Sequence, residues 1–410
     1  MKKSVLFVTY GGGHIAKVAP VVKELEARGV ACTVLALTVG HAVARRQGLS
    51  PVGYRDFLYL VDAKKALELG SSLLEANQHP DVDETESRAY LGINYLDWIE
   101  QHGELEANRL YNAGGRRTFF PLKFMGRLLE ALRPSVVVST SSPRSEQAAI
   151  EAAVIRGIPT LTIMDLFALP YDIYLRQPVH ADRITVLSDV VRKNLVAAGI
   201  AESRIRVTGC PAYDALQEEQ FRDRGEEFRK SLGWEGFTVV MWAGYMEEAR
   251  HTPAPYYGTG LGLLVEKRLR DWVSSTQKTA LIVRYHPNQF HYFPSLGEQD
   301  RVYLAQPAIE PVQTQLYASD TVVVQTSTVG LEAALIGKRV LNLRFAQSVI
   351  DLGFDYSELG IAEGVNDLDE LSAALSHSGG APNHTSALRP PSGKAAPRVA
   401  DEIMQLAHRH

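Results

Sequence analysis

The residue best suited to catalysis near the start of the chain is His14, which ends the run Tyr-Gly-Gly-Gly-His. An imidazole has an unperturbed pKa of about 6.5, so it can remove a proton from a hydroxyl group near neutral pH. Gly12 and Gly13 let the backbone approach a bound ligand closely. The spacing is not G-x-G-x-x-G, and no acidic residue ends the next apolar run, so a dinucleotide site is only weakly indicated. A hydrogen-bonding or helix-capping histidine is the alternative.

A second polar segment, STSSPRSEQAA at residues 139–149, also follows an apolar run. Ser141 and Ser142 can hold an anion or a sugar hydroxyl beside a helix N-terminus, or can simply cap that helix. Arg144 is a candidate for binding an anionic acceptor, with an ordinary surface arginine as the alternative. Asp165 ends the run TLTIMD and has three interpretations: it orients the histidine, acts as the base itself, or caps the next turn.

In the second half of the chain, IVRYHPN carries two candidate phosphate ligands. Arg284 offers a planar pair of donors and His286 a further one, while Pro287 holds the histidine in an extended conformation. A loop with an internal ion pair is the alternative. Gly244 and Tyr245 follow the first apolar run of this half, and we expect them to face the phosphate groups of a bound nucleotide.

The most informative stretch is QTSTVGLEAALIGKRVL. Thr326, Ser327 and Thr328 occupy the turn between a buried strand and a helix, where hydroxyls and free backbone N–H groups form a phosphate site. Gly330 and Glu332 follow within the helix. The Glu332 carboxylate can accept hydrogen bonds from a ribose diol, whereas the alternative is a solvated acid that the helix dipole favours.

All these segments follow short apolar runs that alternate with longer segments of helical period. Runs that are apolar on both faces are typical of parallel sheets covered by helices, and ligands bind such sheets beyond the carboxyl ends of the strands. We therefore expect two doubly wound α/β units. The expected strands are residues 4–10, 32–37, 135–140, 160–165, 183–189 and 204–209 in the first unit, and 237–244, 280–287, 301–306, 321–327 and 339–345 in the second.

The expected first domain spans residues 1–214 and carries a helical insertion at about 54–130, of a kind that often shapes an acceptor pocket. Aromatic residues in YLGINYLDWIEQ recur at helical spacing, which favours the core over stacking on a sugar. A charged linker and first helix at 215–236 lead into the second domain at 237–393. SHSGGAPNHTSALRPPSGKA predicts a surface loop, and a last helix at 394–410 closes the chain.

Composition sets limits on the class of protein. The 410 residues are 45% hydrophobic and 22% charged, with a formal net charge of −4, which argues against a dedicated nucleic-acid-binding protein. Cys32 and Cys210 lie far apart in apolar contexts and predict reduced thiols in a cytoplasmic protein. The first apolar run is broken by glycines, which favours a buried strand over a signal peptide, and no run reaches the ~18 residues of a membrane span. We expect any membrane contact to be peripheral.

The order of these segments and their amino-acid sequences resemble those of the GT-B superfamily of nucleotide-sugar enzymes. GGGHIAKVAPVVKEL resembles the start of inverting GT-B glycosyltransferases, in many of which a histidine at this point is the catalytic base. The run from VVVSTSSPRS to TLTIMD is similar to their late first-domain segment. HADRITVLSDVVRKNLVAAGIAESRIRVTGCPAYDAL is similar to their approach to the linker, with Gly209-Cys210-Pro211 where G-N-P is usual. QTSTVGLEAALIGKRVL resembles the donor-binding strand and helix of bacterial surface-polysaccharide transferases, and GKAAPRVADEI resembles their closing helix.

The resemblance covers nearly the whole chain except about 50–130. It implies two Rossmann-like domains that face a cleft, a last helix that crosses back to the first domain, closure on the donor, and no required metal or other cofactor. The first domain would bind the acceptor, which is a glycan, a lipid-linked molecule or a small molecule. The second would bind a nucleotide sugar. The oligomeric state stays open.

The implied function is that of a metal-independent inverting glycosyltransferase in bacterial glycan or glycoconjugate synthesis. His14 would deprotonate an acceptor hydroxyl with Asp165 orienting it, unless Asp165 is itself the base. Arg284 and His286 would neutralise the leaving group, and Glu332 would hold the ribose.

Three other interpretations stay open. Hydrolysing UDP-GlcNAc 2-epimerases share this layout but usually carry more acidic residues late in the first domain, where this chain has serines and Asp165. Glu247 and Glu248 in WAGYMEEARH keep that branch open. The His286–Pro287 pair also resembles transferases that use cytidine nucleotides, of the CMP-sialic acid or Kdo type, so UDP is favoured only slightly. A non-catalytic nucleotide-sugar-binding protein ranks last, because the candidate base and the phosphate turn are both present.

Overall fold

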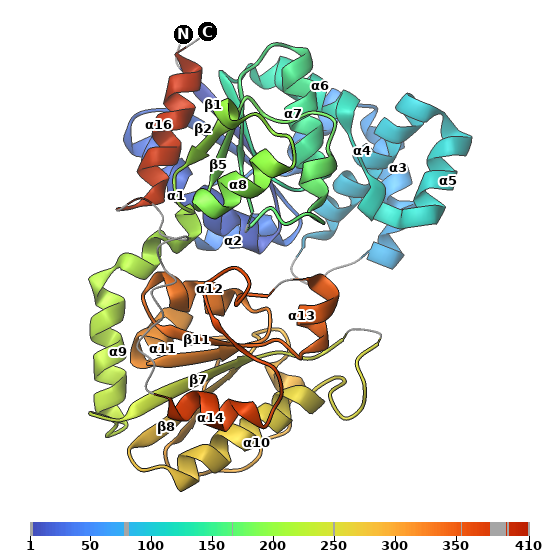
Figure 1. Cartoon of the computed structure of the whole chain (residues 1–410). Coiled ribbons are helices and arrows are strands. Elements are labelled where there is room, and N and C mark those ends of the chain that lie inside the picture. The colour runs from blue at the N-terminus through green and yellow to red at the C-terminus, as the bar shows by residue number, and fades with distance from the viewer. Residues whose placement is uncertain are drawn as a thin grey trace. The chain divides into compact units, whose positions relative to one another are not determined.

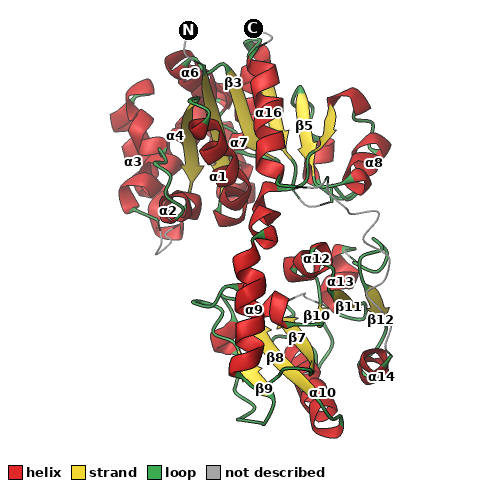
Figure 2. Ribbon diagram, turned by 90° about the vertical axis from the view of Figure 1, so that its left-hand side faces the viewer, coloured by secondary structure: helices red, strands yellow, loops and turns green. Residues whose placement is uncertain are grey.

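The computed structural model describes residues 3–77, 82–165, 167–248, 251–353, 355–377, 391 and 393–408. Contacts within the chain divide it into two compact units. Unit 1 comprises Met1–Asp214 and Pro390–His410, and unit 2 comprises Ala215–Arg389. In each unit a parallel sheet lies between layers of helices (Figures 1 and 2).

Unit 1 is built on a sheet of six parallel strands in the order β2-β1-β3-β4-β5-β6. The strands are β1 (Ser4–Tyr10), β2 (Ala31–Leu37), β3 (Val136–Thr140), β4 (Thr160–Ile163), β5 (Arg183–Val186) and β6 (Ile205–Val207). In β1, Val5 is in register with Cys32 of β2 and with Val136 of β3. The chain therefore adds β2 on one side of β1 and then adds β3 and the later strands on the other side.

Alternate residues of β1 point into two different cores, because side chains on a strand alternate between its faces. The covering helices are α1 (Gly12–Ala27), α2 (Val39–Arg46), α7 (Ser145–Ile155), α8 (Asp189–Ala197) and α16 (Ala395–Ala407). Val5 and Phe7 belong to the apolar cluster that includes α1 and α16, whereas Leu6 and Val8 belong to the cluster that includes α7 and the insertion. Both faces of this strand are thus buried.

The segment between β2 and β3 is helical. It contains η1 (Tyr54–Leu60), α3 (Ala63–Leu74), η2 (Glu75–Asn77), α4 (Glu84–His102), α5 (Glu104–Gly114), η3 (Gly115–Thr118) and α6 (Leu122–Leu132). Gly70 and Gly92 let α3 and α4 pack closely, because a Cβ at either position would collide with a backbone carbonyl of the other helix. Tyr95 and Trp98 of α4 are buried in this core.

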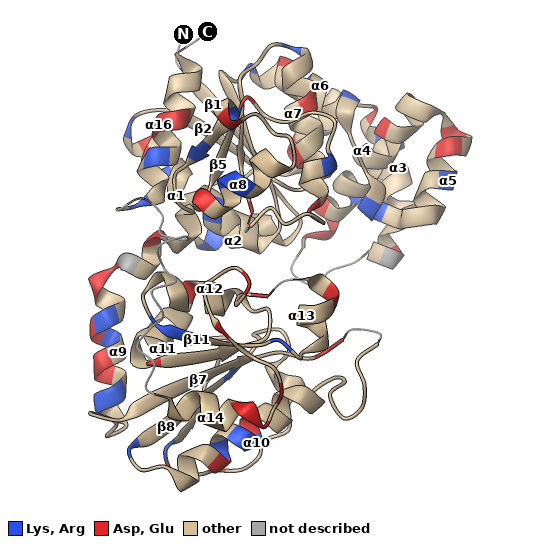
Figure 3. Cartoon of the chain, viewed as in Figure 1, with Lys and Arg blue, Asp and Glu red and all other residues tan. Residues whose placement is uncertain are grey.

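Unit 2 also has a six-stranded parallel sheet, in the order β12-β11-β10-β7-β8-β9. Its strands are β7 (Thr238–Gly244), β8 (Thr279–Tyr285), β9 (Val302–Leu304), β10 (Thr321–Val324), β11 (Arg339–Leu343) and β12 (Glu363–Val365). Its α-helices are α9 (Glu219–Ser231), α10 (Gly260–Ser275), α11 (Val312–Ala318), α12 (Thr328–Leu335), α13 (Gln347–Leu352) and α14 (Glu370–Ser376). Acidic and basic side chains intermix along α9 (Figure 3).

The fold class predicted from the sequence is confirmed, and eleven of the expected runs coincide with strands. The strand that the sequence missed is β12, whose three residues Glu-Gly-Val contain one buried side chain and no apolar run. Short 3-10 turns complete the chain: η4 (Ile173–Arg176), η5 (Glu202–Arg204), η6 (Pro211–Gln217) and η7 (Phe290–Tyr292). Most of the predicted Gly-, Pro- and Ser-rich loop, residues 378–390 and 392, lies outside the described residues.

The C-terminal helix α16 belongs to unit 1 and lies beside α1 in Figure 1. The buried carboxylate of Asp214 accepts hydrogen bonds from the backbone N–H groups of Ala395 (2.6 Å) and Ala396 (2.8 Å). These are the first N–H groups of the helix, which have no partner inside it. Within the described residues, no helix is long and apolar enough to cross a membrane.

Replacing Asp214 with alanine should lower the free energy of unfolding by about 1–2 kcal/mol, because two buried N–H groups lose their acceptor. Urea unfolding of wild type and variant measures the change. Asp401→Ala on the same helix is the matched control, since it removes only a surface ion pair with Arg28. Equal loss of stability in the two variants would contradict the capping role.

Candidate active site

In unit 1, His14 lies where the strand order changes direction. The chain leaves β1 toward β2 on one side and later returns to β3 on the other, so the loops after β1 and β3 diverge. Ligands bind α/β sheets at such switch points. Gly11 makes the turn after β1 in the left-handed region (φ 77°), and α1 begins at Gly12. Gly13 and His14 follow in its first turn, with open space beside the Gly13 Cα.

The His14 ring bridges the ends of two strands. Its Nδ1 is 2.7 Å from the hydroxyl oxygen of Thr140, the last residue of β3. Its Nε2 is 3.5 Å from the Oδ2 atom of Asp165, which follows β4. The side chain keeps 22% of its surface exposed. The structure therefore brings together the two residues that the sequence proposed as base and orienting acid.

Lys17 completes the group from one turn further along α1. Its ammonium forms an ion pair with the Oδ1 atom of Asp165, and its side chain is buried. The backbone N–H of Asp165 donates to the hydroxyl of Ser141 at 3.1 Å. The carboxylate is thus fixed from both sides, and Ser141 contributes by holding its backbone.

A second carboxylate, that of Glu146, lies on the other side of the ring. Glu146 is on α7 and has 0% exposure. Its Oε1 accepts from the Thr140 hydroxyl at 3.5 Å and is 3.9 Å from His14 Nδ1. Its Oε2 has no hydrogen-bond partner among the described residues. The sequence search missed Lys17, Thr140 and Glu146, although Lys17 follows His14 by three residues, a spacing that places both on one helix face.

These neighbours determine the charge state of the ring. Burial and the positive charge of Lys17 both lower the pKa of His14. The hydrogen-bonding interactions with Asp165 and Glu146 raise it and outweigh them, so the pKa of His14 lies above its ordinary value. Burial alone would raise the pKa of Asp165, but His14 and Lys17 outweigh it and hold that pKa well below its usual range. Asp165 is therefore ionised at neutral pH.

The contacts also assign the histidine tautomer. We assign the Thr140 hydroxyl as donor to Glu146 (3.5 Å), and on that assignment its oxygen accepts from the Nδ1–H of His14. That leaves Nε2 as the nitrogen that can take up a proton, beside the carboxylate of Asp165. A base held in one tautomer and stabilised when charged is the arrangement that general-base catalysis requires.

The other first-unit candidates lie close by. Ser142 is half-buried at the start of the β3–α7 loop. The Arg144 guanidinium lies over the ring of Tyr10, 3.9 Å from its centroid, and its side chain makes no hydrogen bond or ion pair with the described residues. Its positive charge is therefore available to a ligand.

In unit 2 the corresponding switch point lies between β7 and β10. The Tyr245 hydroxyl contacts that of Thr326, and the Tyr245 N–H donates to the Gln325 side chain at 3.1 Å. Ser327 caps α12 by accepting from the Val329 N–H at 3.3 Å. Thr328 begins α12. Hydroxyls and helix N–H groups thus gather at this edge, and their contact with a phosphate stays a prediction.

Two glycines near this edge serve packing. A Cβ at Gly244 would collide with the ring of Trp242, and one at Gly330 would come within 2.9 Å of the Val324 side chain. Gly330 therefore lets α12 lie close against β10. Their direct contact with a nucleotide stays a prediction.

Glu247, one of the two acids that left the epimerase interpretation open, makes buried hydrogen bonds within unit 2. It has 0% exposure, accepts from the Gln325 amide, and accepts from the Ser348 backbone (2.9 Å) and hydroxyl (2.6 Å). These bonds tie the loop after β7 to β10 and α13. Glu248 is exposed and accepts from Gln289 at 3.2 Å.

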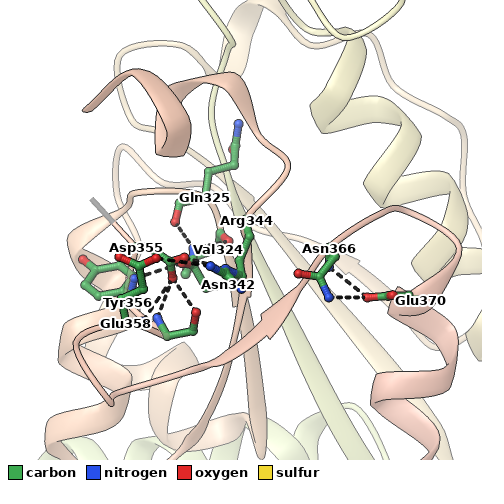
Figure 4. Close-up of polar contacts among 10 residues, drawn as sticks. Val324, Gln325, Asn342, Arg344, Asp355, Tyr356, Glu358, Asn366 and Glu370 are labelled. Carbon is green, nitrogen blue, oxygen red and sulfur yellow. Dashed lines mark hydrogen bonds and ion pairs between the residues drawn. The ribbon is translucent and has the colours of Figure 1, made fainter. Parts of the chain in front are cut away.

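Asn342 of β11 fixes the loop that leads into α12 (Figure 4). Its amide donates to the Gln325 carbonyl at 2.6 Å, and its Oδ1 accepts from the Tyr356 N–H at 3.0 Å. The Tyr356 hydroxyl in turn donates to the Ser327 carbonyl at 2.9 Å. Nearby, Arg344 pairs with Asp355 at 2.6 Å. The turn at 326–328 is therefore held in place by buried polar contacts.

Glu332 lies on α12, with its carboxylate largely withdrawn from solvent. Burial raises its pKa to about 7, and the charge of Arg284 opposes that rise. Arg284 itself is buried, and its guanidinium donates to Gln315 (2.8 Å) and to the carbonyls of Pro307 (3.3 Å) and Glu310 (3.0 Å). These contacts favour a structural role for Arg284 over direct contact with a leaving group.

His286 and Pro287 are exposed at the end of β8. The His286 Nδ1 accepts from the Asn288 N–H at 3.2 Å, and partial burial lowers the pKa of the ring. A phosphate contact by His286 stays a prediction.

Within the described residues, no group of three or more His, Cys, Asp or Glu is arranged to hold a metal ion.

No protein-family model matches the chain, and no curated protein matches its sequence. Solved structures, however, match it along its length. A Listeria monocytogenes protein provisionally identified as a UDP-N-acetylglucosamine 2-epimerase gives a TM-score of 0.61 at 18% identity, covering 100% of this chain and 98% of that one. The glycotransferase of kitacinnamycin gives 0.57 at 15%, covering 98% of each chain. The wall teichoic acid polymerase TagF, soaked with CDPG, gives 0.55 at 12%, covering 100% and 90%.

The chain has the GT-B fold. The resemblance inferred from its motifs is confirmed at that level. Epimerases and transferring enzymes share this fold, so the reaction has to be argued from the site.

Asp165→Asn should lower the pKa of His14, because the variant removes a hydrogen-bonding carboxylate and leaves the Lys17 charge unpaired beside the ring. An NMR pH titration of the histidine ring protons measures the shift. Asp189→Asn, which changes an exposed acid on α8, should leave that titration unchanged. A His14 pKa that is the same in all three proteins would contradict the coupling described here.

Proposed function

We propose that this protein is a metal-independent inverting glycosyltransferase that moves a sugar from a nucleotide-sugar donor to an acceptor hydroxyl. The observation that carries the proposal is the partly exposed His14 ring, held between the Thr140 hydroxyl at Nδ1 and the Asp165 carboxylate at Nε2. We place the enzyme in bacterial glycan or glycoconjugate synthesis and in the cytoplasm, following the resemblance of its donor-binding segment. UDP is slightly favoured as the nucleotide.

In the proposed reaction, the acceptor oxygen attacks the anomeric carbon of the donor while His14 Nε2 takes its proton. The bond between that carbon and the phosphate oxygen breaks, and the nucleotide leaves with the bonding electrons. Attack on the face opposite the leaving group inverts the configuration. Asp165 stabilises the imidazolium that forms, and Lys17 keeps Asp165 ionised.

The donor would bind at the carboxyl edge of the unit 2 sheet. The turn at 326–328 supplies hydroxyls and the first N–H groups of α12, which favour the negative charge of phosphate. Tyr245 borders this turn from β7, and Glu332 would accept hydrogen bonds from the ribose. Because Arg284 is engaged by its own loop, we assign neutralisation of the leaving group chiefly to this turn, with His286 as a further donor.

An epimerase acting on UDP-GlcNAc is the second candidate, because a structure provisionally identified as such an enzyme resembles this chain. Epimerisation at C2 requires a proton to leave and return at that carbon. Incubation of the protein with UDP-GlcNAc in D₂O therefore separates the candidates: an epimerase incorporates deuterium into the recovered sugar, whereas a transferase does not. The TagF structure soaked with CDPG leaves a cytidine nucleotide as the alternative to UDP. A non-catalytic binding protein would show no turnover.

Replacing His14 with alanine should lower the rate of acceptor-dependent sugar transfer about 100- to 10,000-fold, because the general base is lost. Release of the nucleotide measures the rate, and calorimetry should show unchanged nucleotide binding. His102→Gln, an exposed histidine at the end of α4, is the control and should retain the wild-type rate. A His14→Ala enzyme with the wild-type rate would rule out the assigned base.

Affinity for UDP should rise with pH between about pH 6 and 8. Burial raises the Glu332 pKa to about 7, and only the ionised form accepts two ribose hydroxyls, so binding releases a proton in this range. Glu332→Gln should weaken binding and flatten that part of the profile. Because the phosphate of UDP also titrates near pH 6, the difference between the two proteins is the quantity to measure.

Glu370→Gln is the matched control, since the Glu370 carboxylate accepts hydrogen bonds only from Asn366 among the described residues (Figure 4). It should keep the wild-type pH profile. If Glu332→Gln keeps it as well, Glu332 does not bind the ribose.

A further inference from the structure

Unit 1 contains a cavity of about 210 Å³ between the ends of β1 and β2 and the helical insertion. Its size falls below the roughly 300 Å³ of a drug-sized site and suits a single ring. Its wall includes Tyr10, Thr38, Glu86, Tyr90, Leu91 and Arg116. Aromatic, aliphatic and charged side chains thus meet in one small space.

Tyr90 supplies a buried donor that has no partner. Its side chain is 4% exposed, and its hydroxyl makes no hydrogen bond with the described residues. Burial raises the pKa of Tyr90, so the hydroxyl keeps its proton at neutral pH. Leaving a buried hydroxyl unpaired is unfavourable, and a ligand oxygen in the cavity would satisfy it.

Arg116 supplies an unpaired positive charge at the same cavity. It is half-buried on η3, and its guanidinium makes no hydrogen bond or ion pair with the described residues. Glu86 is the acidic residue among the described residues that line the cavity, and it does not contact Arg116 directly. Its two carboxylate oxygens accept from the backbone N–H groups of Tyr54 (2.8 Å) and Arg55 (3.1 Å). The cavity therefore combines an available cation with an available donor.

Tyr10 links the wall of the cavity to the segment that carries His14. Tyr10 ends β1 and precedes His14 by four residues. The guanidinium of Arg144 stacks on the Tyr10 ring. The charges of Arg144 and Glu146 both act on the Tyr90 hydroxyl. A molecule anchored in the cavity would therefore lie beside the end of β1, the strand that precedes His14.

We propose that this cavity binds the acceptor, and that the acceptor is a sugar-sized molecule with a carboxylate or phosphate group. Arg116 and Tyr90 hold the anionic group, with Arg144 as a further cation, and the ring packs against Tyr10 and Leu91. Guanidinium groups bind both anions through paired N–H donors. This inference rests on the proposed transferase function and adds the chemical class of its acceptor.

The test is calorimetric titration of the whole protein, without nucleotide, with three probes: glucuronate, glucose 6-phosphate and glucose. At least one anionic probe should bind about tenfold or more tightly than glucose, and the tighter of the two identifies carboxylate or phosphate. Arg116→Gln should remove that preference. Tyr90→Phe, which deletes only the hydroxyl, should weaken binding of the anionic probe several-fold. Arg117→Gln, its exposed neighbour, is the matched control and should bind like wild type.

Equal binding of glucose and both anionic probes, no binding of either anionic probe, or wild-type affinity in Arg116→Gln would each overturn the proposal. UDP binding is measured on the same samples and tests the donor site proposed in unit 2. Anion-selective binding that depends on Arg116 in a protein that binds no nucleotide would overturn the proposed transferase function, while the specificity of the cavity would stand.

Discussion

Parallel strands place their carboxyl ends, and the free N–H groups of the helices that follow them, along one edge of a sheet. In both units the chain leaves its first strand to one side and returns on the other, so a space opens at that edge between the first strand and the neighbour added on its other side. His14 and Thr140 meet at this position in unit 1, and Tyr245 and Thr326 meet at it in unit 2. The candidate chemistry depends on this topology, since residues more than a hundred positions apart become neighbours only through strand order.

The two edges differ in their electrostatics, which is why we assign them different tasks. In unit 1, Asp165 and the fully buried Glu146 flank one histidine, with Lys17 as counter-charge, so a proton on the ring is stabilised. In unit 2 the edge consists of hydroxyls and amides that buried Asn342 and Glu247 hold in place. The first arrangement suits proton transfer and the second suits binding of a phosphate.

The strands could be predicted because their residues are apolar on both faces, whereas β12 has too few residues to form a pattern. His14 and Asp165 could be predicted because each follows such a run. Lys17 and Glu146 could not, because a lysine or glutamate on a helix ordinarily faces solvent and only the packing shows that these two are buried. The partners of Arg284 were equally hidden, since they come from α11 and the loop before it.

A crystal structure of the protein soaked with UDP tests the central claim most directly, because it shows where the nucleotide binds. The proposed assignment predicts the diphosphate at the hydroxyls and N–H groups of residues 326–328, with the ribose against Glu332 and the space beside His14 Nε2 free of nucleotide. A nucleotide bound at the unit 1 edge, with its phosphates against His14 and Arg144, would contradict this division of tasks between the two units.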